Sequence, residues 1–121
     1  MDTDCSDDIL VFKFEMEESD GDFDVFDSKV SVVTVNLNNV EGLERTIWSF
    51  VDQVYPNKEL IVIDGGSSDG SVEVLSRNES HIAYWISERD KGLYDAMNKG
   101  VKYCTGDYVI FMNSGDRFFA V

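Results

Sequence analysis

Short hydrophobic runs alternate with segments of helical periodicity along the chain from Val30 onward. Four of these runs are rich in β-branched and aromatic residues, which favour strands, and each is apolar enough to be covered on both faces of a sheet. The predicted strands are residues 30–35, 60–63, 82–86 and 108–112. Strands that alternate with helices over short turns indicate a mainly parallel sheet covered by helices, which is an α/β fold.

Three helices are predicted between these strands. The first has apolar residues at helical spacing, namely Leu43, Ile47, Phe50, Val51 and Val54. Either Asn38 or Asn39 is placed to cap its first turn, and Pro56 ends it. The second helix, residues 70–77, is short. The third helix, residues 93–103, carries its predicted core face on Leu93, Ala96, Met97, Val101 and Cys104.

The carboxyl ends of the four strands are expected along one rim of the sheet, because crossovers between parallel strands are right-handed. Ligands of open α/β sheets bind at that rim. The polar residues that follow the strand ends are Asn36, Asp64, Glu88 and Asn113. Their expected convergence predicts a nucleotide site.

Acidic residues are concentrated at the start of the chain. Residues 1–29 hold eleven Asp and Glu against two lysines, so −9 of the formal charge of −14 lies there. We divide the chain into an acidic leader, residues 1–28, expected as a mobile extension or an added edge strand, and a folded domain, residues 29–121. The pI near 4.1 argues against binding to nucleic acid or to an anionic membrane surface, because both need a basic footprint.

Cysteine content and the absence of targeting signals bear on location. Cys5 and Cys104 are too few for a disulfide framework or a zinc cluster. The first residues, MDTDCSDD, lack the basic start and apolar run of a signal peptide, and no apolar run approaches the ~20 residues of a spanning helix. We expect a cytoplasmic protein with no membrane span in this chain, and leave membrane association of a full-length enzyme open.

A glycine-rich turn, IDGGSSDGS, follows the second predicted strand and opens a helix, so it offers backbone N–H groups to an anion or a sugar. It is neither a P-loop nor a dinucleotide fingerprint, because no Gly-Lys-Ser follows and the glycine offsets differ. Asp64, at the strand end, is a candidate acceptor for hydrogen bonds from a base or ribose. Asp69 is assigned to capping the next helix.

The last predicted strand ends in the turn of GDYVIFMNSGD, which presents Asn113 and Asp116. Oxygen ligands on such a turn suit Mg²⁺ or Mn²⁺, the cations that neutralise a diphosphate leaving group. The alternative interpretation is a plain turn that joins two strands.

Four segments follow one another at predicted strand ends and helix starts: VSVVTVNLNN, ELIVIDGGSSDGS, SERDKGLYDAMNKGVKYCTGDY and VIFMNSGD. In this order they resemble the inverting family 2 glycosyltransferases, whose Rossmann-like GT-A fold is a three-layer sandwich around a mainly parallel sheet. The resemblance covers residues 29–121 and implies the donor-binding half of that fold. The residues that it assigns to the nucleotide and its diphosphate are Thr34, Val35, Asn36, Asp64, Asp90 and Lys91. Helix capping stays open for Asp90, and a solvent-facing role stays open for Lys91.

The resemblance also implies a divalent metal, Mn²⁺ or Mg²⁺, held by Asp116 with Asn113 as a weaker amide ligand. Because Asn113 stands where the family has a carboxylate, metal affinity is expected to depend on the phosphates of the substrate. The family often has a second acidic residue after Asp64, where this chain has Gly65. The identity of the nucleotide therefore stays open, with uracil expected ahead of guanine or thymine.

These features predict a glycosyltransferase donor domain that binds a nucleotide-diphosphate sugar, with a UDP-sugar expected first. Transfer with inversion to an acceptor hydroxyl, on a glycan or a lipid-linked sugar, would serve polysaccharide or other cell-surface glycan synthesis. The catalytic base is expected beyond Val121. The alternative is a noncatalytic nucleotide-sugar-binding or assembly module. A nucleotidyltransferase is disfavoured, because the first strand is followed by NLNNVEG in place of a glycine-rich loop with a basic residue.

Overall fold

The computed structural model describes residues 9–13 and 28–115. The strands are β1 (Ile9–Lys13), β2 (Val30–Asn36), β3 (Lys58–Asp64), β4 (Tyr84–Ser87) and β5 (Tyr108–Asn113). The helices are α1 (Val40–Asp52), α2 (Ser71–Arg77) and α3 (Leu93–Val101), with a 3₁₀ turn, η3 (Glu79–His81), before β4. Within these ranges, no helix has both the length and the apolar content needed to cross a bilayer.

The strands form a single sheet in the order β1-β5-β2-β3-β4. The four strands from β2 to β5 run parallel, and β1 pairs antiparallel with β5 at one edge. The mainly parallel α/β sheet predicted from the sequence is therefore confirmed. β1 falls inside the acidic leader, and the division of the chain at residue 28 stays a prediction.

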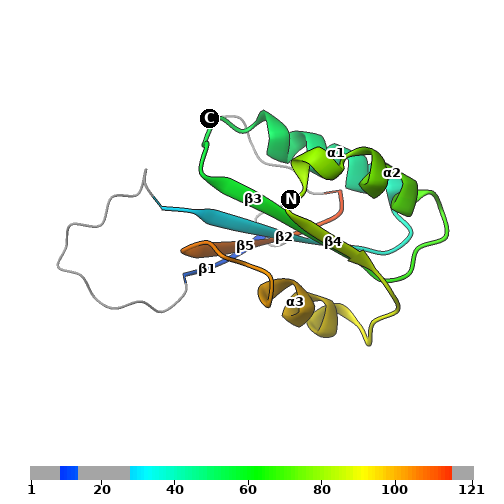
Figure 1. Cartoon of the computed structure of the whole chain (residues 1–121). Coiled ribbons are helices and arrows are strands. Elements are labelled where there is room, and N and C mark those ends of the chain that lie inside the picture. Colours follow the sequence, from blue (N-terminus) through cyan, green and yellow to red (C-terminus); the bar gives the residue numbers. More distant parts are fainter. Residues whose placement is uncertain (1–8, 14–27, 116–121) are drawn as a thin grey trace, which may run out of the picture.

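Helices cover both faces of the sheet, which gives three layers (Figure 1). α1 and α2 lie on one face and bury a cluster that includes Leu43, Ile47 and Leu75. α3 lies on the other face and approaches the sheet closely at Gly100, where an added Cβ would sit 2.4 Å from Val33 Cγ1. Any side chain at position 100 would push α3 away from the sheet, so glycine sets the distance between these two layers.

Strand register brings the polar strand ends together. Asn36 is the register partner of Asp64, and Asp64 is the partner of Ser87. On the other side of β2, Val35 is paired with Asn113. The carboxyl ends of β5, β2, β3 and β4 therefore stand side by side along one edge of the sheet.

Two helix predictions need correction. α1 ends at Asp52, and Val54 lies outside the helix with 89% of its surface exposed. Leu93, expected in the core face of α3, is 50% exposed. Leu93 is the first residue of α3 and lies beyond the carboxyl edge of the sheet, where a cleft and not the core receives it. Between Asn38 and Asn39, the cap of α1 is Asn39, whose side-chain oxygen accepts from Gly42 N at 3.1 Å.

Candidate functional site

A row of hydrogen-bonded side chains joins the carboxyl ends of the four parallel strands. Ser114 Oγ, just after β5, donates to Asn36 Oδ1 on β2 at 2.6 Å. Asn36 Nδ2 donates to Asp64 Oδ1 on β3 at 2.7 Å, and Ser87 Oγ on β4 donates to Asp64 Oδ2 at 2.8 Å. We call Ser114, Asn36, Asp64 and Ser87 the carboxyl-edge row. The predicted convergence of Asn36 and Asp64 at one rim is thus present in the structure.

Asp64, at the centre of this row, is fully buried. Its oxygens also accept hydrogen bonds from the N–H groups of Gly66 at 3.1 Å and Ser67 at 2.8 Å, and from Ser67 Oγ at 2.7 Å. Burial acts most strongly and raises the pKa of Asp64, but the hydrogen bonds together outweigh it and hold the pKa below its ordinary value. Both oxygens are used inside the chain, so the geometry gives Asp64 the role of fixing the β3–α2 turn and offers no free oxygen to a base or ribose.

Asp69 joins the starts of two helices. Its Oδ1 accepts from the backbone N and the hydroxyl of Ser71, the first residue of α2, at 3.1 and 2.7 Å. Its Oδ2 accepts from the N–H of Val40, the first residue of α1, at 2.9 Å. The Ser71 hydroxyl in turn accepts from Asn36 Nδ2 at 2.9 Å, which connects the helix starts to the carboxyl-edge row.

A cleft of about 360 Å³ opens between the ends of β2 and β5 and the start of α3. Its apolar lining is Val35, Leu37, Leu93 and Ala96, and its polar and glycine lining is Asn36, Asn39, Asp90, Gly92, Asn113 and Ser114. Among these residues, Asp90 is the one with a charged side chain. Apolar walls with a few placed polar groups at the carboxyl edge of a parallel sheet are typical of a small-molecule site.

The structure separates the predicted site residues into two groups. Val35, Asn36, Asp90 and Asn113 line the cleft. Thr34 is fully buried and does not line the cleft, because it lies further inside β2 than Val35 and Asn36, which stand at the end of the strand.

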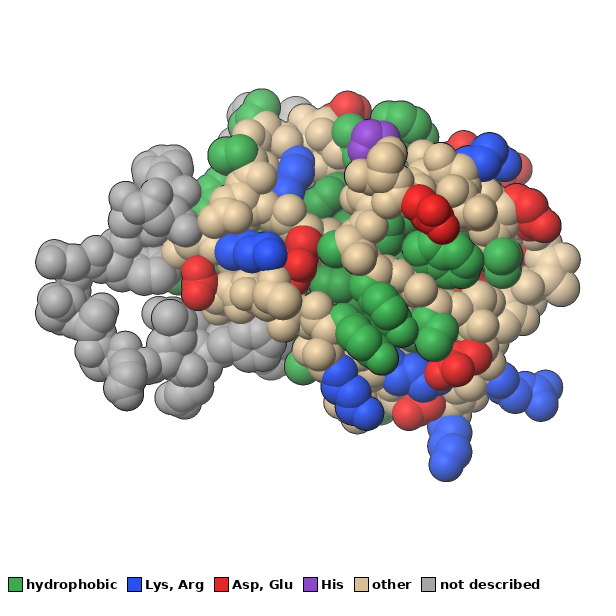
Figure 2. Space-filling model, viewed as in Figure 1, with side chains coloured by type: hydrophobic (Ala, Val, Ile, Leu, Met, Phe, Trp, Pro, Cys, Tyr) green, Lys and Arg blue, Asp and Glu red, His purple; other side chains and the backbone are tan. Residues whose placement is uncertain are grey.

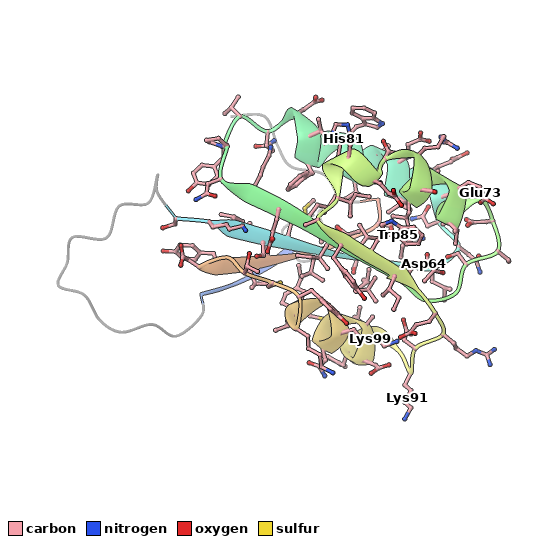
Figure 3. The ribbon with its side chains drawn as sticks, in the orientation of Figure 1. Asp64, Glu73, His81, Trp85, Lys91 and Lys99 are labelled. Carbon is pink, nitrogen blue, oxygen red and sulfur yellow. The ribbon has the colours of Figure 1, made fainter. Side chains whose placement is uncertain are left out.

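Lys91 also lies outside the cleft. Its side chain is exposed at the tip of the β4–α3 turn and points away from the body of the molecule (Figure 3). Basic side chains near the start of α3 project into solvent in the same way (Figure 2). The predicted contact of Lys91 with a diphosphate stays a prediction that this geometry does not favour. Asp116, the predicted metal ligand, lies outside the described residues.

The loop that carries Asp90 is tied to α3 on both sides of that residue. Lys99 Nζ pairs with Glu88 Oε2 at 3.0 Å and donates to the carbonyl oxygen of Arg89 at 3.4 Å. The backbone N of Lys91 donates to Asp95 Oδ2 at 2.9 Å. The hydrogen bond with Glu88 is the largest cause that raises the pKa of Lys99. These contacts fix the position at which Asp90 enters the cleft.

Sequence reasoning missed several cleft residues, among them Leu37, Asn39 and Ser114. The sequence predicts Asn39 as a possible helix cap, and in the structure its Nδ2 also donates to the carbonyl oxygen of Ser114 at 3.2 Å. Gly115 N donates to Thr46 Oγ1 at 3.0 Å, so the turn after β5 is attached to α1. The sequence does show a pair of asparagines between a strand and a helix, which is a signal for a functional loop. It does not show that Asn39 contacts a turn 75 residues away.

Oxygen donors dominate the rim where a metal was predicted. Within the described ranges, no group of three His, Cys, Asp or Glu side chains is placed to hold a metal ion. Asn113, the described member of the predicted metal pair, lines the cleft and would offer an amide oxygen, and neither a thiol nor an imidazole occurs among the described lining residues. Such an oxygen donor fits a hard cation such as Mg²⁺ or Mn²⁺ that takes its remaining ligands from phosphate and water.

Comparison with known proteins identifies the family. Residues 31–118 match the family model described as Glycosyl transferase family 2. The chain belongs to this family. An uncharacterized glycosyltransferase of Mycobacterium tuberculosis is 50% identical to this family 2 chain over 90 residues, which cover 74% of the chain and 34% of that protein. The Escherichia coli UDP-Glc:alpha-D-GlcNAc-diphosphoundecaprenol beta-1,3-glucosyltransferase is 34% identical over 95 residues, covering 78% and 38%.

Solved structures extend the comparison of this family 2 chain to the fold. A mannosyltransferase of Pyrobaculum calidifontis in complex with GDP-Man and Mn²⁺ superposes with a TM-score of 0.71 at 25% identity, covering 77% of this chain and 29% of that one. The GT-A fold expected from the resemblance is thereby confirmed. The chain spans 34% of the Mycobacterium tuberculosis relative and 38% of the Escherichia coli one, and less of several others.

Proposed function

We propose that this chain carries the donor-binding part of an inverting glycosyltransferase, which transfers a sugar from a nucleotide diphosphate to an acceptor hydroxyl with a divalent metal at Asn113 and Asp116. The observation that supports the proposal most directly is the cleft at the carboxyl edge, lined by Asn36, Asp90 and Asn113. Two similar proteins are glycosyltransferases by name: the Escherichia coli relative is named for a UDP-Glc donor, and the Pyrobaculum calidifontis mannosyltransferase was solved with GDP-Man and Mn²⁺.

The charge of the cleft supports the metal. Its described lining has one carboxylate, Asp90, and neither lysine nor arginine. A diphosphate would meet no side-chain cation there, so its binding needs a counter-ion supplied with it. The metal, when bound, neutralises the charge that develops on the leaving diphosphate. The chain's own residues hold the turn after β5 in place through Ser114 and Asn39.

The acceptor site and the catalytic base are proposed to lie in sequence that the longer relatives have outside the matched segment, because this chain spans about a third of their length. The acceptor is proposed to be a glycan or a lipid-linked sugar. A UDP-sugar remains the first candidate for the donor.

The test is calorimetric titration of the chain with UDP, GDP and dTDP, each with and without Mn²⁺. We expect metal-dependent binding of at least one nucleotide, loss of that binding in Asp116→Ala, and an affinity reduced about tenfold in Asn113→Ala. Glu73→Gln on the outer surface of α2 is the matched control and should bind as the unchanged chain does (Figure 3). Nucleotide binding that depends neither on Mn²⁺ nor on Asp116 would refute the metal assignment. Absence of binding of any of the three nucleotides would refute the proposed function.

A further inference from the structure

Asp90 and Gly65 share one small space beside the cleft, although they belong to different loops. A Cβ added to Gly65 would lie 3.0 Å from Asp90 Oδ2 and 3.5 Å from Leu37 Cδ1. Gly65 is not among the glycines with positive φ, so its backbone would accept a side chain. Glycine at position 65 leaves room for the Asp90 carboxylate, and a Cβ there would press on Oδ2 so that the carboxylate would have to shift.

The Asp90 carboxylate is held by one oxygen and presented by the other. Oδ1 accepts a hydrogen bond from Gly92 N at 3.1 Å. Within the part of the chain that the structure describes, no donor bonds to Oδ2. This arrangement contrasts with Asp64, both of whose oxygens are used by the chain. Asp90 therefore brings a charged acceptor to the cleft with unused hydrogen-bonding capacity.

The remaining lining defines what that acceptor would meet. Val35, Leu37, Leu93 and Ala96 supply apolar surface, and Asn39, Asn113 and Ser114 supply neutral polar groups. A sugar ring matches this combination, because it has an apolar face and a rim of hydroxyl donors. A second negative charge does not match it, since no lysine or arginine among the described lining residues would offset repulsion from Asp90.

We infer that Asp90, with the space kept by Gly65, selects the sugar of the donor: Oδ2 accepts a hydrogen bond from a hydroxyl of an uncharged sugar and excludes a uronic acid. This inference rests on the proposed function and adds the class of sugar to it. Asp90 is a binding and specificity residue in this assignment, and Gly65 acts through it as a positioning residue.

The test compares UDP, UDP-glucose and UDP-glucuronic acid by calorimetry in the presence of Mn²⁺; if the chain prefers guanine, GDP, GDP-mannose and GDP-mannuronic acid replace them. The unchanged chain should bind the neutral donor at least about tenfold more tightly than the acidic one. Asp90→Asn should lose roughly tenfold in affinity for the neutral donor, narrow the difference between the two donors, and leave affinity for the nucleoside diphosphate unchanged. Asp52→Asn, an exposed acid at the end of α1, is the matched control.

A double-mutant cycle tests the shared space. Gly65→Ala alone should weaken binding of the neutral donor, because the added methyl group displaces the Asp90 carboxylate. Added to Asp90→Ala, which has no carboxylate at position 90, it should reduce the affinity for the neutral donor no further. Circular dichroism and thermal unfolding report whether each variant is folded.

The outcomes separate this inference from the function on which it rests. Equal affinity for both donors, no effect of Asp90→Asn on donor preference, or additive effects of the two alanine variants would overturn the inference while nucleotide binding persists. Absence of nucleotide binding in the unchanged chain would overturn the proposed function and this inference with it.

Discussion

The two edges of the parallel sheet each hold a carboxylate that the chain itself satisfies. At the amino edge, Glu59 accepts from Ser31 Oγ at 2.6 Å and from Thr105 N at 2.7 Å, and pairs with Lys29 at 3.3 Å. At the carboxyl edge, Asp64 is bonded in the same manner within the carboxyl-edge row. The carboxyl edge differs because a second set of polar groups, including Asp90, faces a cleft. A carboxylate at a strand end that the chain itself satisfies is therefore a poor marker of a binding residue unless an oxygen is left for the ligand.

The largest effect that would test this comparison is expected from Asp64→Ala. The change leaves a buried donor on Asn36 and partly buried donors on Ser67 and Ser87 without their acceptor, so we expect the free energy of unfolding to fall by about 3 kcal/mol or more. Urea denaturation followed by circular dichroism measures it. If stability is kept and nucleotide binding alone is lost, Asp64 contacts the nucleotide and the two edges are not equivalent.

A smaller effect is expected from removing one hydroxyl at each edge. Ser31→Ala removes one of the donors to Glu59 and the acceptor of Gly106 N, and Ser114→Ala removes a donor from Asn36. Each should destabilise the fold by about 1 kcal/mol. Only Ser114→Ala should also weaken metal-dependent nucleotide binding, because Ser114 belongs to the turn that carries Asn113. Equal loss of binding in both variants would show that the edges are coupled through global stability.

The smallest effect is expected from lowering the pH, which should reduce the stability of the fold. Asp64 and Glu59 both have a folded-state pKa below their ordinary values of 3.8 and 4.5. Burial is the largest single cause and raises each pKa, but the several hydrogen bonds to each carboxylate together lower the pKa by more than burial raises it. The two carboxylates contribute fully to the free energy of unfolding when the pH is above their ordinary pKa values. This contribution is lost as the pH falls through their lowered folded-state pKa values. Urea midpoints between pH 7 and 3 should decline below about pH 4.5. The urea midpoint of Asp64→Asn should be lower at pH 7 and should fall less steeply with decreasing pH than that of the unchanged chain. If the two midpoints fall in parallel, Asp64 does not contribute to the acid sensitivity of the fold.

Hydrophobic patterning predicted the sheet well because burial on both faces leaves a continuous apolar run. It missed the polar ends of the strands. β3 begins at Lys58 and not at Leu60, since the polar residues there pair with β2 and bond across the amino edge. β4 begins at Tyr84 because the preceding 3₁₀ turn uses the N–H of Ile82 to close on Glu79 at 3.1 Å.

The site was predictable as a place but not as a set of contacts. Strand order and handedness were enough to bring Asn36, Asp64 and Asn113 to one rim. Whether Asp64 faces a ligand or its own chain depends on distances of a few tenths of an ångström, which no spacing in the sequence reports. The proximity of Asp90 to Gly65 depends on the path of two loops, for which periodicity carries no information.

The double attachment of Asp69 has a consequence for how the molecule comes apart. One carboxylate holds the first turns of both α1 and α2, and the two bonded amides, on Val40 and Ser71, are far apart in the chain. Loss of the Asp69 carboxylate would therefore remove a first-turn hydrogen bond from both helices at once, and we expect the starts of α1 and α2 to fray more readily together in such a variant.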